Sequence, residues 1–391
     1  MAIEEYELLK EFIFNRPSGS TEELRALSLV REQIFNLGKQ AEILPFDMVD
    51  YEVIEANLRS DNKEYTVEGI KGSGSVNGIT SQLYFMENSS DQDNFKLKGK
   101  IVLIEGSLDY EKYVKLINCK AVAFITYDET ITELDNKYLK YGTIPGVKMK
   151  KDLARELIKD NPTFITLSLE QRSTFRQGRT LISEIRGFKF PSEIITISTS
   201  LDSSKNSIGA YDSGSGIVNS LKLYEYFTIN PPKRTIRFLW LGSEKINDMG
   251  SRHYLDSLED EEISRIIFNL SCDKCGLALG KTTINVYAEH ALANYISYES
   301  KISSYPIHVT SKHNNSSAIS FASRGVPSLL FSKISTMKEP EVDDISLISQ
   351  EQLEQTYEFL AKLLDKFVNA DTFPVKRIIP DEVKEIIKKF N

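Results

Sequence analysis

The chain has 391 residues, of which 41% are hydrophobic and 27% are charged, a composition typical of a globular protein long enough for two or three packed domains. Its 56 acidic residues outnumber its 48 basic residues and give a net charge of −8, which excludes the basic surface that nucleic-acid phosphates require. Three cysteines are too few for a disulfide framework, and no apolar run approaches the roughly 18 residues that span a bilayer, so we expect neither a nucleic-acid nor a membrane partner.

The first 50 residues predict two helices and a strand. Apolar residues recur every three or four positions in EEYELLKEFIF (4–14) and TEELRALSLVREQIFNLG (21–38), and Gly38 is expected to end the second helix. Thr21, followed by two glutamates, is expected to cap that helix. Acidic residues stand at the amino terminus where a secretory signal peptide carries basic ones, so we expect a cytoplasmic protein.

Residues 52–175 have a different texture. Short β-rich runs broken by turns, such as LKGKIVLIEG (97–106), replace the helical pattern. A helix is expected over 109–119, leading into the buried strand KAVAFITY (120–127). We therefore predict a β-rich domain over 52–175, inserted into a second domain formed by 1–51 and 176–391.

After residue 176 strands and helices alternate along the chain. This alternation predicts an α/β domain with a mostly parallel sheet sandwiched by helices. Ligands of such sheets bind outside the carboxyl ends of the strands. Asp202, Glu244 and Asp273 each stand where a strand-like run gives way to a loop, so they are candidate site residues; the alternative is that they are ordinary solvated loop acids. Strands are expected in 181–187, 193–203, 234–244, 266–276 and 327–332, and helices in 215–227, 250–262 and 350–367.

Five segments in this half carry a resemblance to a known family. In chain order they are TSLDSS (199–204), GAYDSGSG (209–216), LGSEKINDMGSRHY (241–254), NLSCDKCG (269–276) and KEPEVDD (338–344). Together they resemble the zinc-dependent aminopeptidase family, double-zinc exopeptidases related to glutamate carboxypeptidase and glutaminyl cyclase. The resemblance covers nearly the whole chain, and residues 52–175 resemble the protease-associated domain that many members insert.

The resemblance implies a catalytic apparatus, part of which is present. In the family an Asp bridges two zinc ions, and a Glu deprotonates the metal-bound water that attacks the peptide. The bridging Asp corresponds to Asp212 and the general base to Glu244. Asp273 matches a ligand of the first metal, and Asp202 matches the residue that orients the site from behind the family's first His.

Three of the five ligand positions are altered. Ser200 stands where the first metal takes a His, and Lys245 stands where the second metal takes a Glu. The His of the late His-Thr-x-x-Asp motif corresponds to Glu339. Zinc favours imidazole or thiolate ligands, whereas this degenerate site offers mainly oxygens.

Lys245 is the alteration with the largest physical consequence. To ligate a metal its amine must be neutral, and lowering a pKa of about 10.4 to near 7 costs roughly 4 to 5 kcal/mol. Charged, the ammonium repels a divalent ion and is expected to pair with Asp212 instead.

Three readings of the function stay open at this point. The first is a non-catalytic or much less active aminopeptidase-like protein without a cofactor. Such a protein could bind a peptide or protein ligand and could form a homo-oligomer. The second is an active metallo-aminopeptidase that uses zinc or another divalent cation in an oxygen-rich site, with Glu244 as base. The third is a metal-independent enzyme in which Lys245 supplies charge or acts as a nucleophile; carboxylates nearby raise a lysine pKa, which argues against the nucleophile.

No other residue obviously restores the metal. His313 lies near the family's Ser-Asp-His-x-x-Phe loop, but Ala318 holds the histidine position. His253, His290 and His308 are expected to be structural. Cys272 and Cys275 could form half of a zinc clip or a redox pair, and reduced cysteines at a strand end are the expected alternative.

Overall fold

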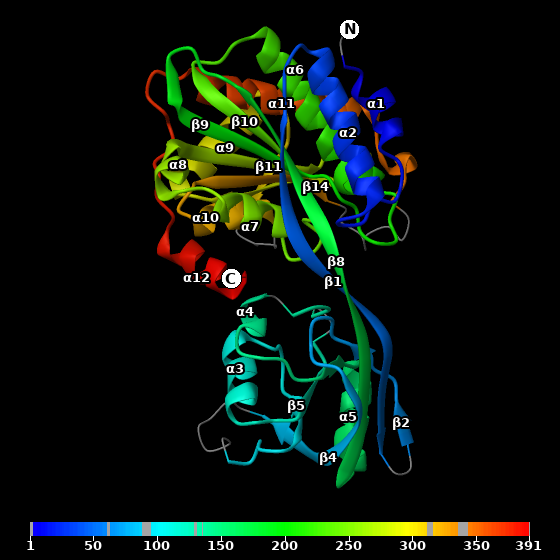
Figure 1. The fold of residues 1–391 in the computed structure, drawn as a ribbon. Helices are drawn as coiled ribbons and strands as arrows, with labels where there is room; N and C mark the ends of the chain where they lie inside the picture. Colours follow the sequence, from blue (N-terminus) through cyan, green and yellow to red (C-terminus); the bar gives the residue numbers. More distant parts are fainter. Residues whose placement is uncertain are drawn as a thin grey trace. The chain divides into compact units, whose positions relative to one another are not determined.

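A computed structural model describes residues 3–60, 63–87, 95–128, 131–134, 136–310, 316–334 and 343–390. The chain divides into two compact units, one formed by 1–48 with 176–391 and the other by 49–175 (Figure 1). Both boundaries fall inside long strands, β1 (Glu42–Ser60) and β8 (Phe164–Ile185). The insert therefore begins three residues before the expected position. Within the described ranges, no helix is long and apolar enough to cross a membrane.

The first unit contains a mixed, mostly parallel sheet. Its strands follow the order β13, β12, β14, β11, β9, β10 and the carboxyl-terminal part of β8. The pairs β9–β10, β9–β11, β11–β14 and β12–β13 are parallel, whereas β8–β10 and β12–β14 are antiparallel. The α/β class expected from the sequence is confirmed. The strands are β9 (Phe190–Ser200), β10 (Arg234–Leu241), β11 (Ile266–Lys274), β12 (Lys281–Tyr287), β13 (His308–Thr310) and β14 (Ser328–Ile334).

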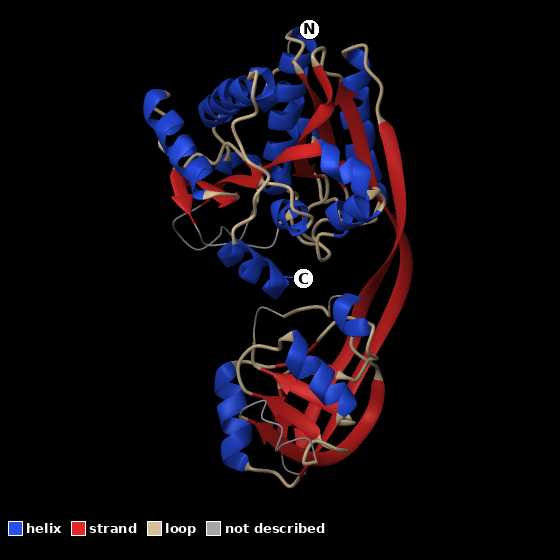
Figure 2. Cartoon of the chain, turned by 90° about the vertical axis from the view of Figure 1, so that its left-hand side faces the viewer, coloured by secondary structure: helices blue, strands red, loops and turns tan. Residues whose placement is uncertain are grey.

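Helices cover both faces of this sheet (Figure 2). Successive residues of a strand point to opposite faces, so Trp240 joins the core under α1, α2, α6 and α11, while Leu239 and Leu241 join the core under α7 and α8. The helices are α1 (Glu5–Glu11), α2 (Thr21–Asn36), α6 (Ser215–Ile229), α7 (Met249–Asp256), α8 (Asp260–Arg265), α9 (His290–Ile302), α10 (Ser317–Ser323), α11 (Gln350–Asn369) and α12 (Asp381–Phe390), with short turns η2 (Ala210–Gly214) and η3 (Ile345–Leu347).

Two local predictions were wrong. Thr21 is the first helical residue of α2, and the cap is Ser20, whose hydroxyl accepts a hydrogen bond from the Glu23 amide at 3.1 Å. The expected helix over 250–262 is two helices, because the chain leaves the helical conformation between Asp256 and Asp260. Elements β12, β13, α9, α10 and α12 were not predicted from the sequence.

The second unit is built around its own sheet, with the order β8, β4, β5, β6, β7 and β3. Separate apolar cores lie in this unit, one containing Ile101 and Ile125 and another containing Val102 and Phe124, as alternation along β5 and β6 requires. Its identity as a protease-associated domain stays a prediction. Its other elements are β2 (Lys63–Tyr65), β3 (Glu68–Gly69), β4 (Val76–Met86), β5 (Ile101–Ile104), β6 (Ala123–Thr126), β7 (Gly146–Lys148), α3 (Tyr110–Asn118), α4 (Asn136–Leu139) and α5 (Lys151–Asp160).

Candidate functional site

The expected site residues gather at one edge of the first unit's sheet. Strands β10, β9 and β11 are neighbours and parallel, so their carboxyl ends meet. Asp202 follows β9, Glu244 follows β10 and Asp273 is the penultimate residue of β11. This edge is where open α/β sheets place their ligands.

Asp202 holds the loop that follows β10. Its buried carboxylate accepts hydrogen bonds from the amide of Glu244 at 3.1 Å and from the amide of Lys245 at 2.9 Å. The hydroxyl of Ser18 donates to the same carboxylate at 2.6 Å. Burial raises the pKa of Asp202, against the opposing charge of Lys245. These contacts hold the backbone of the loop after β10, and the expectation that Asp202 is a catalytic residue stays a prediction.

Glu23, at the start of α2, holds the residue that precedes Glu244 in the same loop. It accepts hydrogen bonds from the Ser243 amide at 2.5 Å and from the Gly19 amide at 3.0 Å. Ser243 has a φ of 60°, a left-handed conformation that costs a non-glycine residue about 1 to 3 kcal/mol unless neighbours hold it. Burial, with the charge of Asp202, raises the pKa of Glu23 to about 8. The sequence showed Glu23 only as a helix first-turn acid.

Asp212 is engaged by two ammonium groups. Lys245 Nζ lies 2.6 Å from Oδ1, and Lys274 Nζ lies 3.4 Å from Oδ2. The side chains of Asp212, Lys245 and Lys274 are 22%, 23% and 24% exposed. Burial raises the pKa of Asp212, but the two positive charges outweigh it and lower the pKa to about 2. Burial lowers the pKa of Lys245, and the surrounding carboxylates, Asp212 first, outweigh this and raise it. The pairing expected between Lys245 and Asp212 is present.

Asp273 and Ser200 contact each other. One oxygen of Asp273 accepts a hydrogen bond from the Ser200 amide at 2.6 Å and from the Thr199 hydroxyl at 3.2 Å. The Ser200 carbonyl accepts from the hydroxyl of Ser213, beside Asp212, at 2.7 Å. Ser200 therefore ties the strand-end acid to the loop that carries Asp212.

Glu244 is buried and turned toward α7. One of its oxygens accepts a hydrogen bond from the Ser251 amide at 2.6 Å. Burial raises its pKa well above the ordinary value, and the charges of Asp248, Asp202 and Asp273 act in the same direction.

The closing motif is partly described. Asp343 accepts hydrogen bonds from the amides of Tyr211 at 2.6 Å and Asp212 at 3.2 Å, and from the Ser207 hydroxyl at 2.9 Å. Asp343 stands at the Asp position of the family's His-Thr-x-x-Asp motif. It holds the loop that carries Asp212, the residue at the position of the bridging Asp. Glu339, the predicted residue at the His position, lies outside the described residues.

Arg16 is a functional neighbour that sequence reasoning missed. Its guanidinium is buried and donates to the carbonyls of Leu201 at 2.7 Å, Phe12 at 2.7 Å and Gly209 at 2.8 Å. It thereby ties the amino-terminal segment to both ends of the loop between Asp202 and Asp212. No motif surrounds Arg16, so the sequence carried no signal for this role.

Comparisons with known proteins relate the first unit to a family of peptidases. Residues 181–364 match the family described as Peptidase family M28. The match covers slightly less than half of the chain and lies within the first unit (1–48 with 176–391), which we name the M28 domain after it. The chain is 25% identical over 387 residues to Aminopeptidase YwaD from Bacillus subtilis (strain 168), in a match that covers 94% of this chain and 84% of that protein. Leucine aminopeptidase 2 from Arthroderma otae (strain ATCC MYA-4605 / CBS 113480) is 27% identical over 235 residues, 57% of this chain and 47% of that relative, so the match spans about half of the fungal protein.

Solved structures share the fold. An aminopeptidase from Aneurinibacillus sp. strain AM-1 has a TM-score of 0.81 at 22% identity and covers 96% of both chains. BSAP, a zinc aminopeptidase from Bacillus subtilis, has a TM-score of 0.69 at 23% identity, also covering 96% of both chains. The described part of the M28 domain thus has the fold of these aminopeptidases. At this level of identity the shared fold does not extend to the side chains of the site.

The described donors of the M28 domain do not fit the two zinc ions that the family implies. Both oxygens of Asp212 face ammonium groups, and Asp273 accepts from two neighbours on β9. Ser200 supplies a hydroxyl in place of an imidazole. In the described ranges, no three His, Cys, Asp or Glu side chains come together in a way that could hold a metal ion.

Within the described ranges, no histidine or cysteine joins a group of side chains that could hold a metal ion. His253 stacks on Phe46 with ring centroids 4.7 Å apart, and His290 Nε2 lies 2.8 Å from a carboxylate oxygen of Glu382. His253 therefore packs against an aromatic ring, as expected of a structural residue, whereas the His290 side chain is 83% exposed and pairs at the surface. Cys272 and Cys275 are buried thiols that form no disulfide. His308 lies in β13 and His313 lies outside the described residues.

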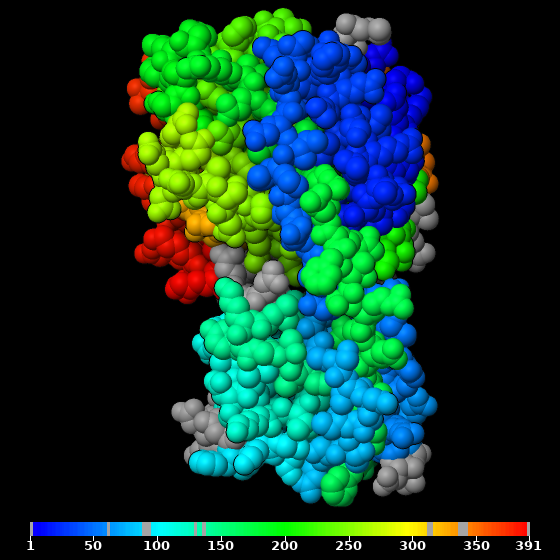
Figure 3. Space-filling model, viewed as in Figure 1, coloured from blue at the N-terminus to red at the C-terminus, as the bar shows by residue number. Residues whose placement is uncertain are grey.

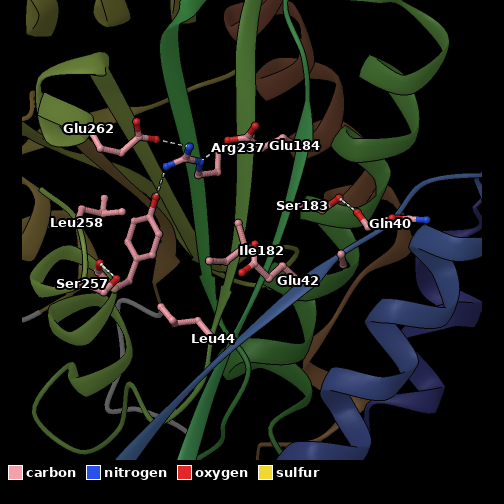
Figure 4. A pocket seen from close by; sticks show the side chains of 12 residues that line it. Gln40, Glu42, Leu44, Ile182, Ser183, Glu184, Arg237, Ser257, Leu258 and Glu262 are labelled. Atoms are coloured by element: carbon pink, nitrogen blue, oxygen red, sulfur yellow. Dashed lines mark hydrogen bonds and ion pairs between the residues drawn. The ribbon is translucent and has the colours of Figure 1, made fainter.

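The M28 domain also contains a pocket whose lining does not include Asp202, Asp212, Glu244 or Asp273 (Figure 4). It has a volume of about 800 Å³ and lies between the start of β1, strands β8 and β10, and helices α7 and α8. In Figure 3 these amino-terminal (blue) and central (yellow-green) segments lie side by side. Arg237 donates there to Glu184, to Glu262 and, at 2.8 Å, to the Tyr254 hydroxyl, so each guanidinium nitrogen already has a partner.

Proposed function

We propose that this chain is an aminopeptidase-like protein whose double-metal site is replaced by an internal ion pair, and that it binds a peptide or protein rather than hydrolysing peptide bonds at a metallopeptidase rate. The observation that supports this proposal most directly is the 2.6 Å contact between Lys245 Nζ and Asp212 Oδ1. An ammonium group at this distance supplies the positive charge that the bridging carboxylate would otherwise take from metal ions.

The surrounding contacts support the same proposal. Asp202 binds the amides of Glu244 and Lys245, so the loop that carries the ammonium is held in place from behind. Asp343 accepts a hydrogen bond from the backbone amide of Asp212, which holds the loop that carries this carboxylate. Both partners of the ion pair are therefore positioned by buried or partly buried hydrogen bonds rather than by chance at the surface.

A second candidate is an active metallo-aminopeptidase with an oxygen-rich site. Its support is the retention of Glu244, the position of the general base, beside Asp212 and Asp273. In this alternative zinc or another divalent cation displaces the ammonium and supplies the charge that polarises a substrate carbonyl. The third reading, a nucleophilic Lys245, is disfavoured because carboxylates raise its pKa and keep it protonated.

Peptidase assays separate the two candidates. The purified chain is incubated with a panel of aminoacyl 4-nitroanilides in zinc and in manganese, and Glu244→Gln is the matched control. The proposal predicts equal background rates for the two proteins. A turnover that falls about a hundredfold or more in Glu244→Gln, the range of general-base catalysis, contradicts the proposal and supports the metallopeptidase.

A further inference from the structure

Asp212 has a second cation whose role the sequence did not predict. Lys274 is the last residue of β11, and its Nζ lies 3.4 Å from Oδ2 of Asp212. Lys245 contacts the other oxygen of this carboxylate, Oδ1. The same ammonium lies over the Tyr211 ring, 5.5 Å from its centroid, where the ring's negative face favours a cation. The Tyr211 hydroxyl is itself fixed by donating to the Lys333 carbonyl at 2.6 Å.

A strand irregularity explains how Lys274 reaches the site. In a regular strand neighbouring side chains point to opposite faces, so Asp273 and Lys274 could not both face Asp212 and Ser200. The register between β11 and β14 shifts between Cys272 and Lys274, with Asp273 as the extra residue. Such a bulge breaks the alternation. Asp273 consequently contacts Ser200 while Lys274 contacts Asp212.

We propose that Lys274 is a second metal-excluding residue, which together with Lys245 places one ammonium group on each carboxylate oxygen of Asp212. This inference rests on the proposed function, because it specifies how the site stays free of metal. A bridging carboxylate offers one oxygen to each of two metal ions, and here each oxygen already faces a positive charge. A divalent ion approaching either oxygen is repelled by the ammonium group that lies there.

The proposal has a consequence that the Lys245 pair alone does not. Ser200→His and Lys245→Glu restore two of the three altered ligand positions but leave Lys274 beside Asp212, so the double variant keeps one of the two repelling ammonium groups. Adding Lys274→Met removes the remaining charge while keeping an unbranched side chain of similar length.

Zinc binding by these variants tests the consequence. Dissociation constants are measured by competition with a chromogenic chelator for the double variant, the triple variant with Lys274→Met, and a control triple variant with Lys281→Met, which changes an exposed lysine at the start of β12. We expect the Lys274→Met triple variant to bind zinc at least about tenfold more tightly than the double variant, and the control to match the double variant. Equal constants for the double and the Lys274→Met triple variant overturn the proposal.

A second measurement decides the matter if none of the variants binds zinc. Acylation of individual lysines by an N-hydroxysuccinimide ester is followed by peptide mapping in the unmodified chain and in Asp212→Asn. We expect Lys274 to react at least about threefold faster in Asp212→Asn, with Lys281 unchanged, because the ion pair no longer restrains its amine. An unchanged Lys274 rate overturns the proposal. Stoichiometric zinc in the unmodified chain would instead overturn the proposed function, which is a separate outcome.

Discussion

Lys245 is bound at both ends, because Asp202 accepts its backbone amide at 2.9 Å while Asp212 accepts its side-chain ammonium at 2.6 Å. The two aspartates belong to different segments, the loop after β9 and the turn before α6. Lys245 thus connects them through a single residue. In the proposed function, the ammonium group of Lys245 takes the place of the metal charge at Asp212.

The ion pair should contribute measurably to stability. Lys245→Met leaves Asp212 with only the more distant Lys274, and we expect the free energy of unfolding to fall by about 1 to 3 kcal/mol, less than for a fully buried pair because both side chains are partly exposed. Urea denaturation followed by tryptophan fluorescence measures it. Lys281→Met, an exposed control, should change stability by less than about 0.5 kcal/mol. Equal effects of the two substitutions would mean that the ion pair does not stabilise the fold.

Glu23 should matter more than its exposed neighbour. Glu23→Ala removes the acceptor of the Ser243 and Gly19 amides, and we expect a loss of about 2 to 4 kcal/mol because buried donors are left without partners. Glu22→Ala, in the same helical turn but exposed, should cost below about 1 kcal/mol. Differential scanning calorimetry compares the two variants. Similar melting temperatures would show that Glu23 acts only through the helix dipole.

The buried Glu5 makes stability depend on pH. Burial raises its pKa to about 7 in the folded chain, despite the opposing charge of Lys222, whereas the unfolded value is about 4.3. A raised carboxyl pKa means that the folded state holds a proton that the unfolded state has lost, so stability falls as pH rises from about 4.3 to 7. We expect Glu5→Gln to remove about 1 to 3 kcal/mol of this loss.

The check on Glu5 is the difference in unfolding free energy between pH 5 and pH 8. It should be smaller in Glu5→Gln than in the unmodified chain, while Glu4→Gln, at an exposed position, should leave it unchanged. A Glu5→Gln variant with an unaltered difference would place the titration elsewhere.

The sequence predicted those parts of the site whose position depends on the order of strands and helices and on motif spacing. Asp202, Glu244 and Asp273 could be placed together because each ends a strand of a sheet whose parallel order follows from alternating strands and helices. Lys245 could be paired with Asp212 because the family resemblance placed both at the same metal. These inferences needed only element order and motif spacing.

The missed residues depend on contacts that spacing does not encode. Arg16 and Glu23 come from the amino-terminal segment, more than 180 positions before the loops that they hold. Lys274 reaches Asp212 because of a bulge in β11, which a regular two-residue period does not predict. For Arg16, Glu23 and Lys274 the decisive interaction is a tertiary contact. In the local sequence each of them resembles an ordinary charged surface residue.

Metal content tests the central claim most directly. The chain is purified without a metal-binding tag, equilibrated with zinc and with manganese, separated from free ions by gel filtration, and analysed for bound metal per chain by elemental analysis. The ion pair of Lys245 with Asp212 predicts a value near zero for both metals. One or two ions per chain would contradict the account and show that the ammonium group yields its place to a metal.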